Sequence, residues 1–138
     1  MKNIVVMVSI AAFLVVVSCG GGKYADAKKA INTQYTMMER FTISIEKAKD
    51  PADVVAALKK FQKTAEESRD EMMAIAEKYP EMKDQANPPE ELKEEMAKMK
   101  EMMPLFIASM MKIGKEYGDN PDVQKVLQEM QAAMVPSK

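Results

Sequence analysis

The feature that most constrains this chain is a hydrophobic repeat in which apolar side chains recur at alternating spacings of four and three residues. One series runs from Val54 to Tyr79, and a second runs from Leu92 to Tyr117. An average spacing of about 3.5 residues is typical of helices that pack along their length, as in coiled coils. Alternating β-branched runs and Asn-Gly or Asp-Gly hairpin turns do not occur after residue 20. The sequence therefore predicts an all-α fold.

Four helices are expected, over residues 24–49, 51–79, 89–117 and 121–135. Asp50 can cap the second helix and Pro51 suits its first position, whereas Pro80 ends it. Gly118 ends the third helix. Short links favour antiparallel neighbours. We therefore expect an antiparallel helical bundle of three long helices plus one short C-terminal helix, forming a single domain over residues 24–136.

The start of the chain has the pattern of an export signal. A short positive segment, residues 1–3, precedes an apolar run from Ile4 to Val17 that only Ser9 interrupts. A membrane span needs about 20 apolar residues, so this run better fits the apolar region of a signal peptide. It ends at Ser18 and Cys19, which three glycines follow.

The segment Val16-Val17-Ser18-Cys19 resembles the lipobox of bacterial lipoproteins. Val16 and Val17 stand where that family prefers Leu and then Ala or Ser, which is similar to the looser boxes of spirochaete lipoproteins. The resemblance covers about the first 20 residues, and the body is similar to the small all-helical lipoproteins of spirochaetes. It implies that residues 1–18 are a signal peptide, that Cys19 is acylated, and that residues 19–23 form a short Gly-rich linker.

This resemblance implies a bacterial membrane protein held by lipid on Cys19, at the outer membrane on its periplasmic face or at the cell surface. Acyl chains bury many methylenes at about 0.8 kcal/mol each, so two or three of them prevent detachment. A plain secretory signal and an uncleaved membrane anchor are the alternatives that the same residues leave open.

The composition removes several classes of function. The chain has no histidine, one cysteine and a formal net charge of -1. Without histidine, imidazole-dependent triads and His-ligated zinc are excluded. A nearly balanced charge gives no overall attraction to nucleic acid. No catalytic residue, metal site or cofactor is expected, and an enzyme is the weakest of the readings considered.

Methionine is the most unusual part of the composition, with 15 residues in the chain. Most of those in the body fall on the predicted helix seams, where methionine fills irregular gaps. Adaptable binding surfaces and soft metals such as Cu(I) also use thioethers. We expect the short fourth helix to leave the half of the bundle nearer Cys19 uncovered, with a hydrophobic groove there. Its candidate residues are Met72, Ile75, Met96, Met99, Met102 and Met103.

Two functional readings follow. The first is a non-enzymatic, lipid-anchored module of the cell envelope that binds an envelope or host protein. The alternative is a carrier that holds a hydrophobic ligand or Cu(I) in the methionine-lined groove.

Overall fold

A computed structural model describes residues 22–84 and 87–134 of the 138-residue chain. These residues form an all-helical fold with the α-helices α1 (Ala25–Lys47), α2 (Pro51–Lys78), α3 (Lys93–Tyr117) and α4 (Pro121–Met134). Short 3-10 turns lie at Pro80–Lys83 and Glu90–Leu92. The described part of the chain contains no strand, and none of its helices is long and apolar enough to cross a membrane. The predicted signal peptide and Cys19 lie outside the described residues.

The helix ends follow the residues that the sequence offers for them. The Asp50 side chain accepts a hydrogen bond from the backbone N–H of Asp53 at 2.9 Å, with Pro51 in the first helical turn of α2. Pro80 follows directly after the end of α2, and Gly118 is the C-terminal cap of α3. The Asp50 cap satisfies one of the backbone N–H groups that the start of a helix leaves unpaired.

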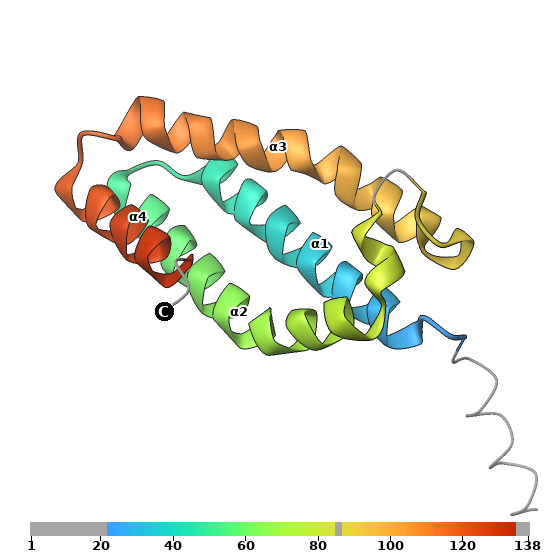
Figure 1. The fold of residues 1–138 in the computed structure, drawn as a ribbon. Coiled ribbons are helices and arrows are strands. Elements are labelled where there is room, and N and C mark those ends of the chain that lie inside the picture. Colours follow the sequence, from blue (N-terminus) through green and yellow to red (C-terminus); the bar gives the residue numbers. More distant parts are fainter. Residues whose placement is uncertain (1–21, 85–86, 135–138) are drawn as a thin grey trace, which may run out of the picture.

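Helix α1 is the centre of the molecule, with α2 along one side and α3 along the other (Figure 1). The short helix α4 packs on α2. The sequence also repeats apolar side chains every seven residues at Tyr24, Ile31, Met38 and Ile45, which predicts a buried seam, and all four are at most 7% exposed. A helix placed between two others must bury side chains on two faces, which explains why α1 also buries Ala27 and Phe41.

The buried side chains form two clusters at opposite ends of the bundle. The distal cluster receives residues from all four helices: Phe41, Ile45, Val54, Ala57, Leu58, Ile113, Val123, Val126 and Met130. The proximal cluster, beside the start of α1, contains Tyr24, Ala27, Ala30, Ile31, Ile75, Tyr79 and Leu92. Helix α4 contributes only to the distal cluster, so the predicted difference between the two halves is confirmed.

Two details of the predicted seams are wrong. On α4, the spacing of apolar residues predicts that Leu127 is buried and Val126 is not. In the structure Val126 is buried and Leu127 only partly buried, because Val126 faces α2 more directly. On α3, Met102 is 6% exposed and Met103 is 44% exposed, the reverse of the predicted order. The buried side of α3 includes Glu95, Met102 and Ser109. Each of them lies one residue before an apolar position of the predicted repeat, because α3 turns this side toward α1. Apolarity alone could not distinguish two adjacent methionines.

Candidate functional site

The residues of the predicted methionine groove surround the proximal cluster only in part. Met72, Met96 and Met99 are partly buried and pack against the cluster that contains Ile75. Met102 is buried and belongs to neither cluster, whereas Met103 is exposed. The three hollows described below are lined by other residues. The structure thus brings four of the six together at the proximal cluster and leaves Met102 and Met103 outside it.

An exposed apolar face lies on the outer side of α3. Met103, Ile107 and Met111 follow one another at intervals of four residues, and their exposed fractions are 44%, 51% and 70%. Leu105 is also exposed, and no charged residue occurs between Met102 and Met111. A helix that is apolar all round is normally buried. The exposure of this apolar face to solvent is therefore unusual.

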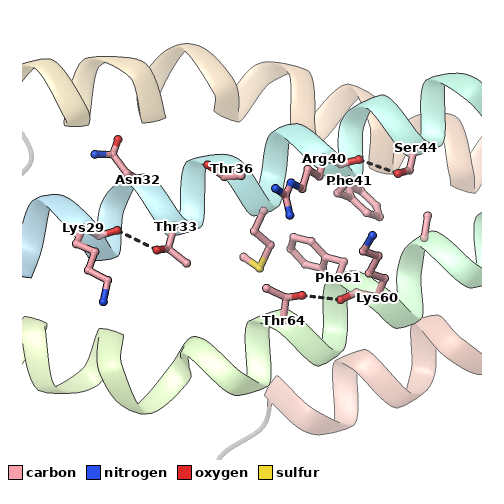
Figure 2. Close-up of a pocket in the computed structure, with 12 residues that line it drawn as sticks. Lys29, Asn32, Thr33, Thr36, Arg40, Phe41, Ser44, Lys60, Phe61 and Thr64 are labelled. Atoms are coloured by element: carbon pink, nitrogen blue, oxygen red, sulfur yellow. Dashed lines mark hydrogen bonds between the residues drawn. The ribbon is translucent and has the colours of Figure 1, made fainter.

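The hollow with the most specific lining is a groove between α1 and α2, with a volume of about 470 Å³ (Figure 2). This volume is in the range of sites for small organic ligands, which is about 300–1,000 Å³. The groove lies where α2 is only half-buried, around Phe61 and Thr64.

Aromatic side chains form the apolar part of this groove. The ring centroids of Phe41 and Phe61 lie 4.9 Å apart, and each ring lies 5.3 Å from that of Phe106. The three rings come from α1, α2 and α3, so they fix these helices relative to one another. Tilted pairs at this distance contribute about 0.5–1.5 kcal/mol beyond their buried area. The apolar floor of the groove is therefore also a rigid part of the core.

The charged side chains of the groove are all cations. Lys29 and Arg40 project from α1 and Lys60 projects from α2, while the lining contains no carboxylate (Figure 2). None of the ion pairs found among the described residues includes these three cations. A groove with unpaired cations and no acid attracts an anion.

Three of the four hydroxyl groups in the groove lining already donate to the backbone of their own helices. Thr33 donates to the Lys29 carbonyl at 3.0 Å, Ser44 to the Arg40 carbonyl at 2.8 Å, and Thr64 to the Lys60 carbonyl at 3.0 Å. The hydrogen-bond donors left for a ligand are therefore mainly the cationic groups, the Asn32 amide and the Thr36 hydroxyl.

Two other hollows are less selective in charge. The larger, about 690 Å³ between α2 and α4, is lined by Lys59 and Lys125 but also by Asp122 and Glu129. The smaller hollow, of about 290 Å³, has both Glu66 and Arg69 in its lining. Opposite charges in one lining offset each other, so neither hollow favours a ligand of one sign.

A hydrogen-bond network of tyrosines and charged groups connects the start of α1 to the end of α2. The Tyr24 hydroxyl donates to Glu81 at 2.7 Å, and the Tyr79 hydroxyl lies 2.6 Å from the Lys23 carbonyl oxygen and 2.7 Å from Asp26 Oδ1. The sequence pattern places both tyrosine rings on the seam but does not reveal these carboxylate partners.

The network shifts the pKa values of its charged members. Hydrogen bonds from Lys78 and Tyr79 lower the pKa of Asp26 to about 2, and those from Tyr24 and Lys23 contribute to lowering that of Glu81 to about 2. The same contacts raise the pKa values of Lys23 and Lys78 above the usual range. All four groups are therefore ionised near neutral pH, and the network ties the proximal end together.

Glu90, Glu91, Glu94 and Glu95 form an acidic block around the start of α3 that the sequence predicts to be solvated, with Glu94 paired to Lys98, but one of the four is buried. Glu95 is 9% exposed, and its Oε2 atom is buried without a hydrogen-bond partner. Lys28 Nζ lies 3.7 Å from Glu95 Oε1, which offsets part of the charge. The neighbouring Glu94 pairs with Lys98 on the surface as expected. Glu95 lies on the inward stripe of α3, which explains the difference.

The site residues that the sequence pattern missed are the cations of the α1–α2 groove. Lys29, Arg40 and Lys60 lie outside the seams and look like ordinary surface charges in the sequence. Only the packing of α1 on α2 brings them to one groove. Comparisons with protein-family models, curated proteins and solved structures found no match to this chain.

Proposed function

We propose that this chain is a lipid-anchored, non-enzymatic interaction module of the bacterial cell envelope. The anchor is acylated Cys19, as the lipobox resemblance implies, and residues 1–18 are removed. The helical body is an antiparallel bundle of three long helices plus one short helix, which presents the outer face of α3 to a partner protein. The localisation at the outer membrane belongs to the same proposal.

The observation that carries this function is the bare apolar face of α3. Met103, Ile107 and Met111 expose large apolar side chains in one row, and exposed patches of this kind commonly mark protein contacts. Burying them against a partner would remove apolar area from water at about 25 cal/mol per Å². Methionine adapts its shape to a partner more easily than branched side chains do.

The charges beside this face indicate the chemistry of the partner. The 3.6-residue period of α3 places Lys100 and Lys115 on the same side as Ile107, and both lysines are exposed. Glu101 and Glu116 fall toward the other edge of the helix. We therefore expect a partner surface with apolar side chains at its centre and carboxylates beside them.

The test is co-isolation of the full chain with its partner after chemical cross-linking in the native cells. The double variant Ile107→Glu with Met111→Glu places two charges on the apolar face without disturbing a buried position. We expect an envelope protein to co-isolate with the wild-type chain and its recovery to fall at least tenfold with the double variant.

The matched control is Ile43→Glu, because Ile43 on α1 is an exposed isoleucine, 42% accessible, away from this face. This control variant should recover the same partner as the wild-type chain. Equal loss from the control and the double variant would contradict the proposed face. Absence of any specific partner would contradict the interaction module itself.

The carrier remains a second proposal, favoured by the packing of Met72, Met96 and Met99 around the proximal cluster. These partly buried thioethers could separate to admit an acyl chain or to bind Cu(I). Native mass spectrometry of protein isolated from membranes tests this, with and without added Cu(I). A mass increase that persists in the Met96→Leu, Met99→Leu variant would contradict a methionine-lined site.

A further inference from the structure

We propose that the groove between α1 and α2 binds an anionic amphiphile, a carboxylate or phosphate group carried on an apolar chain. This site is separate from the outer face of α3 and from the methionines of the proximal cluster. It is therefore independent of the proposed function, and the two can fail separately.

The groove combines the two kinds of contact that such a molecule needs. Its apolar part is formed by Phe41 and Phe61, together with Met37. Its cationic part is formed by Arg40 and Lys60, which extend from opposite helices toward the region of the two phenyl rings (Figure 2). A ligand seated here would place its apolar chain on the rings and its anionic group between the two cations.

The charge of the groove selects the sign of the ligand. Arg40 offers a planar set of N–H donors that suits a carboxylate or phosphate, and Lys60 offers a compact ammonium group. Neither side chain is engaged in an ion pair with a described residue, so binding an anion breaks no existing pair. A carboxylate in the lining would repel the ligand, and the groove has none.

The length of the groove selects a chain rather than a compact ion. Lys29 and Arg40 are separated by 11 positions on α1, which corresponds to about 16 Å along a helix. The volume of about 470 Å³ greatly exceeds the space that one inorganic anion needs. Between the two ends lie Asn32, Thr33 and Thr36, whose polar atoms keep part of the groove wet.

The ring cluster gives the site a preformed floor. Because Phe106 of α3 packs against both Phe41 and Phe61, the rings keep their positions when the groove is empty. Binding to a preformed site avoids the cost of ordering side chains. An acidic protein segment could also meet the cations, but a floor only two rings wide between two helices fits one apolar chain better.

The experiment uses the full chain in its native cells, labelled with a fatty acid that carries a photoreactive diazirine in the chain. Peptide mapping of the labelled protein by mass spectrometry locates the cross-links. We expect labelling concentrated within residues 29–44 and 57–64. Labelling spread evenly over the exposed faces of all helices would overturn the proposal.

Competition with unlabelled compounds then identifies the chemistry. Oleate and lysophosphatidate share the anionic group and the chain, and they distinguish a free fatty acid from a lipid headgroup. At least one of them should reduce groove labelling about tenfold, whereas oleyl alcohol and inorganic phosphate should not. Equal competition by the alcohol would refute the role of the cations. Competition by a polyglutamate peptide but by neither lipid would instead indicate a protein-docking groove.

Variants assign the effect to the cations. Arg40→Gln combined with Lys60→Gln should lower groove labelling at least tenfold, because the anionic group of the ligand loses both of its charge-assisted hydrogen bonds. The matched control Lys63→Gln removes an exposed lysine of α2 that does not line the groove. Circular dichroism shows whether each variant keeps its helix content. Unchanged labelling in the folded double variant would overturn the proposal.

Discussion

The two ends of this bundle are held together by different physical means. At the distal end all four helices meet, and Ile45, Leu58 and Ile113 are completely buried among apolar neighbours. At the proximal end α4 contributes no residue, and the cluster combines two alanines and two tyrosines with Ile31, Ile75 and Leu92. The tyrosine hydroxyls there are bonded to Asp26 and Glu81.

This difference shows how a small bundle can be stable at one end and adaptable at the other. The distal cluster depends on apolar burial, which changes little with pH. The proximal cluster depends in part on exposed hydrogen bonds and ion pairs, which solvent weakens. The described chain begins at this proximal end, at residue 22, which follows Cys19 closely in the sequence, so under the proposed function the tethered end is the less rigid one.

The largest expected difference between the ends comes from matched truncations on α1. Ile45, in the distal cluster, is 0% exposed and Ile31, in the proximal cluster, is 6% exposed. Ile45→Ala should reduce the free energy of unfolding by about 3–5 kcal/mol, and Ile31→Ala by about 2–3 kcal/mol. Urea denaturation measures both. A larger loss for Ile31→Ala would reverse the proposed order of the two clusters.

A smaller effect is expected when the proximal network loses one hydroxyl. Tyr79→Phe keeps the buried ring but removes the contacts of the hydroxyl with the Lys23 carbonyl and Asp26, so unfolding should become easier by about 1–2 kcal/mol. Tyr35→Phe is the control, since the Tyr35 hydroxyl contacts only its helix neighbour Glu39, at 3.3 Å. Thermal unfolding should show little change for this control. Equal shifts in the two variants would contradict a special role for the network.

The smallest effect is expected on acidification, because the carboxylates concerned are exposed. The pKa values of Asp26 and Glu81 are lowered to about 2 in the folded chain from ordinary values of 3.8 and 4.5. Their contribution to stability is therefore complete above the ordinary values and is lost as the pH falls toward 2. Hydrogen exchange should show faster opening of residues 24–31 and 75–83 at pH 3, after correction for the intrinsic rate.

Amides of residues 54–58 and 123–130 should keep their protection from exchange over the same pH range. The reason is that none of the described carboxyl groups with a lowered pKa lies in the distal cluster. The double variant Asp26→Asn with Glu81→Gln should remove the pH dependence at the proximal end. If acid opened both ends equally, the electrostatic distinction between them would be lost.

Hydrophobic periodicity was sufficient to predict the helices and most of the core. The ends of α2 and α3 depend instead on local signals such as Asp50, Pro80 and Gly118. The error at Met102 and Met103 arose because identical side chains on adjacent positions carry no information about the facing helix. Only the packing of α3 against α1 decides which one is buried.

The candidate site was harder to predict for the same reason. Arg40 and Lys60 belong to different helices with a turn between them. No sequence pattern indicates that their side chains line the same groove. Their juxtaposition follows from how α1 and α2 are rotated against each other. Likewise, the sequence does not distinguish Ile107 from a buried apolar residue. Only the structure shows that its side chain is exposed and that no described helix covers it.

The most direct test of a tethered module is the mass of the N-terminal peptide of the protein isolated from its own membrane. The account predicts that this peptide begins at Cys19 and carries two or three acyl chains. A peptide with an unmodified Cys19 sulfur, or one that still contains residues 1–18, would contradict it.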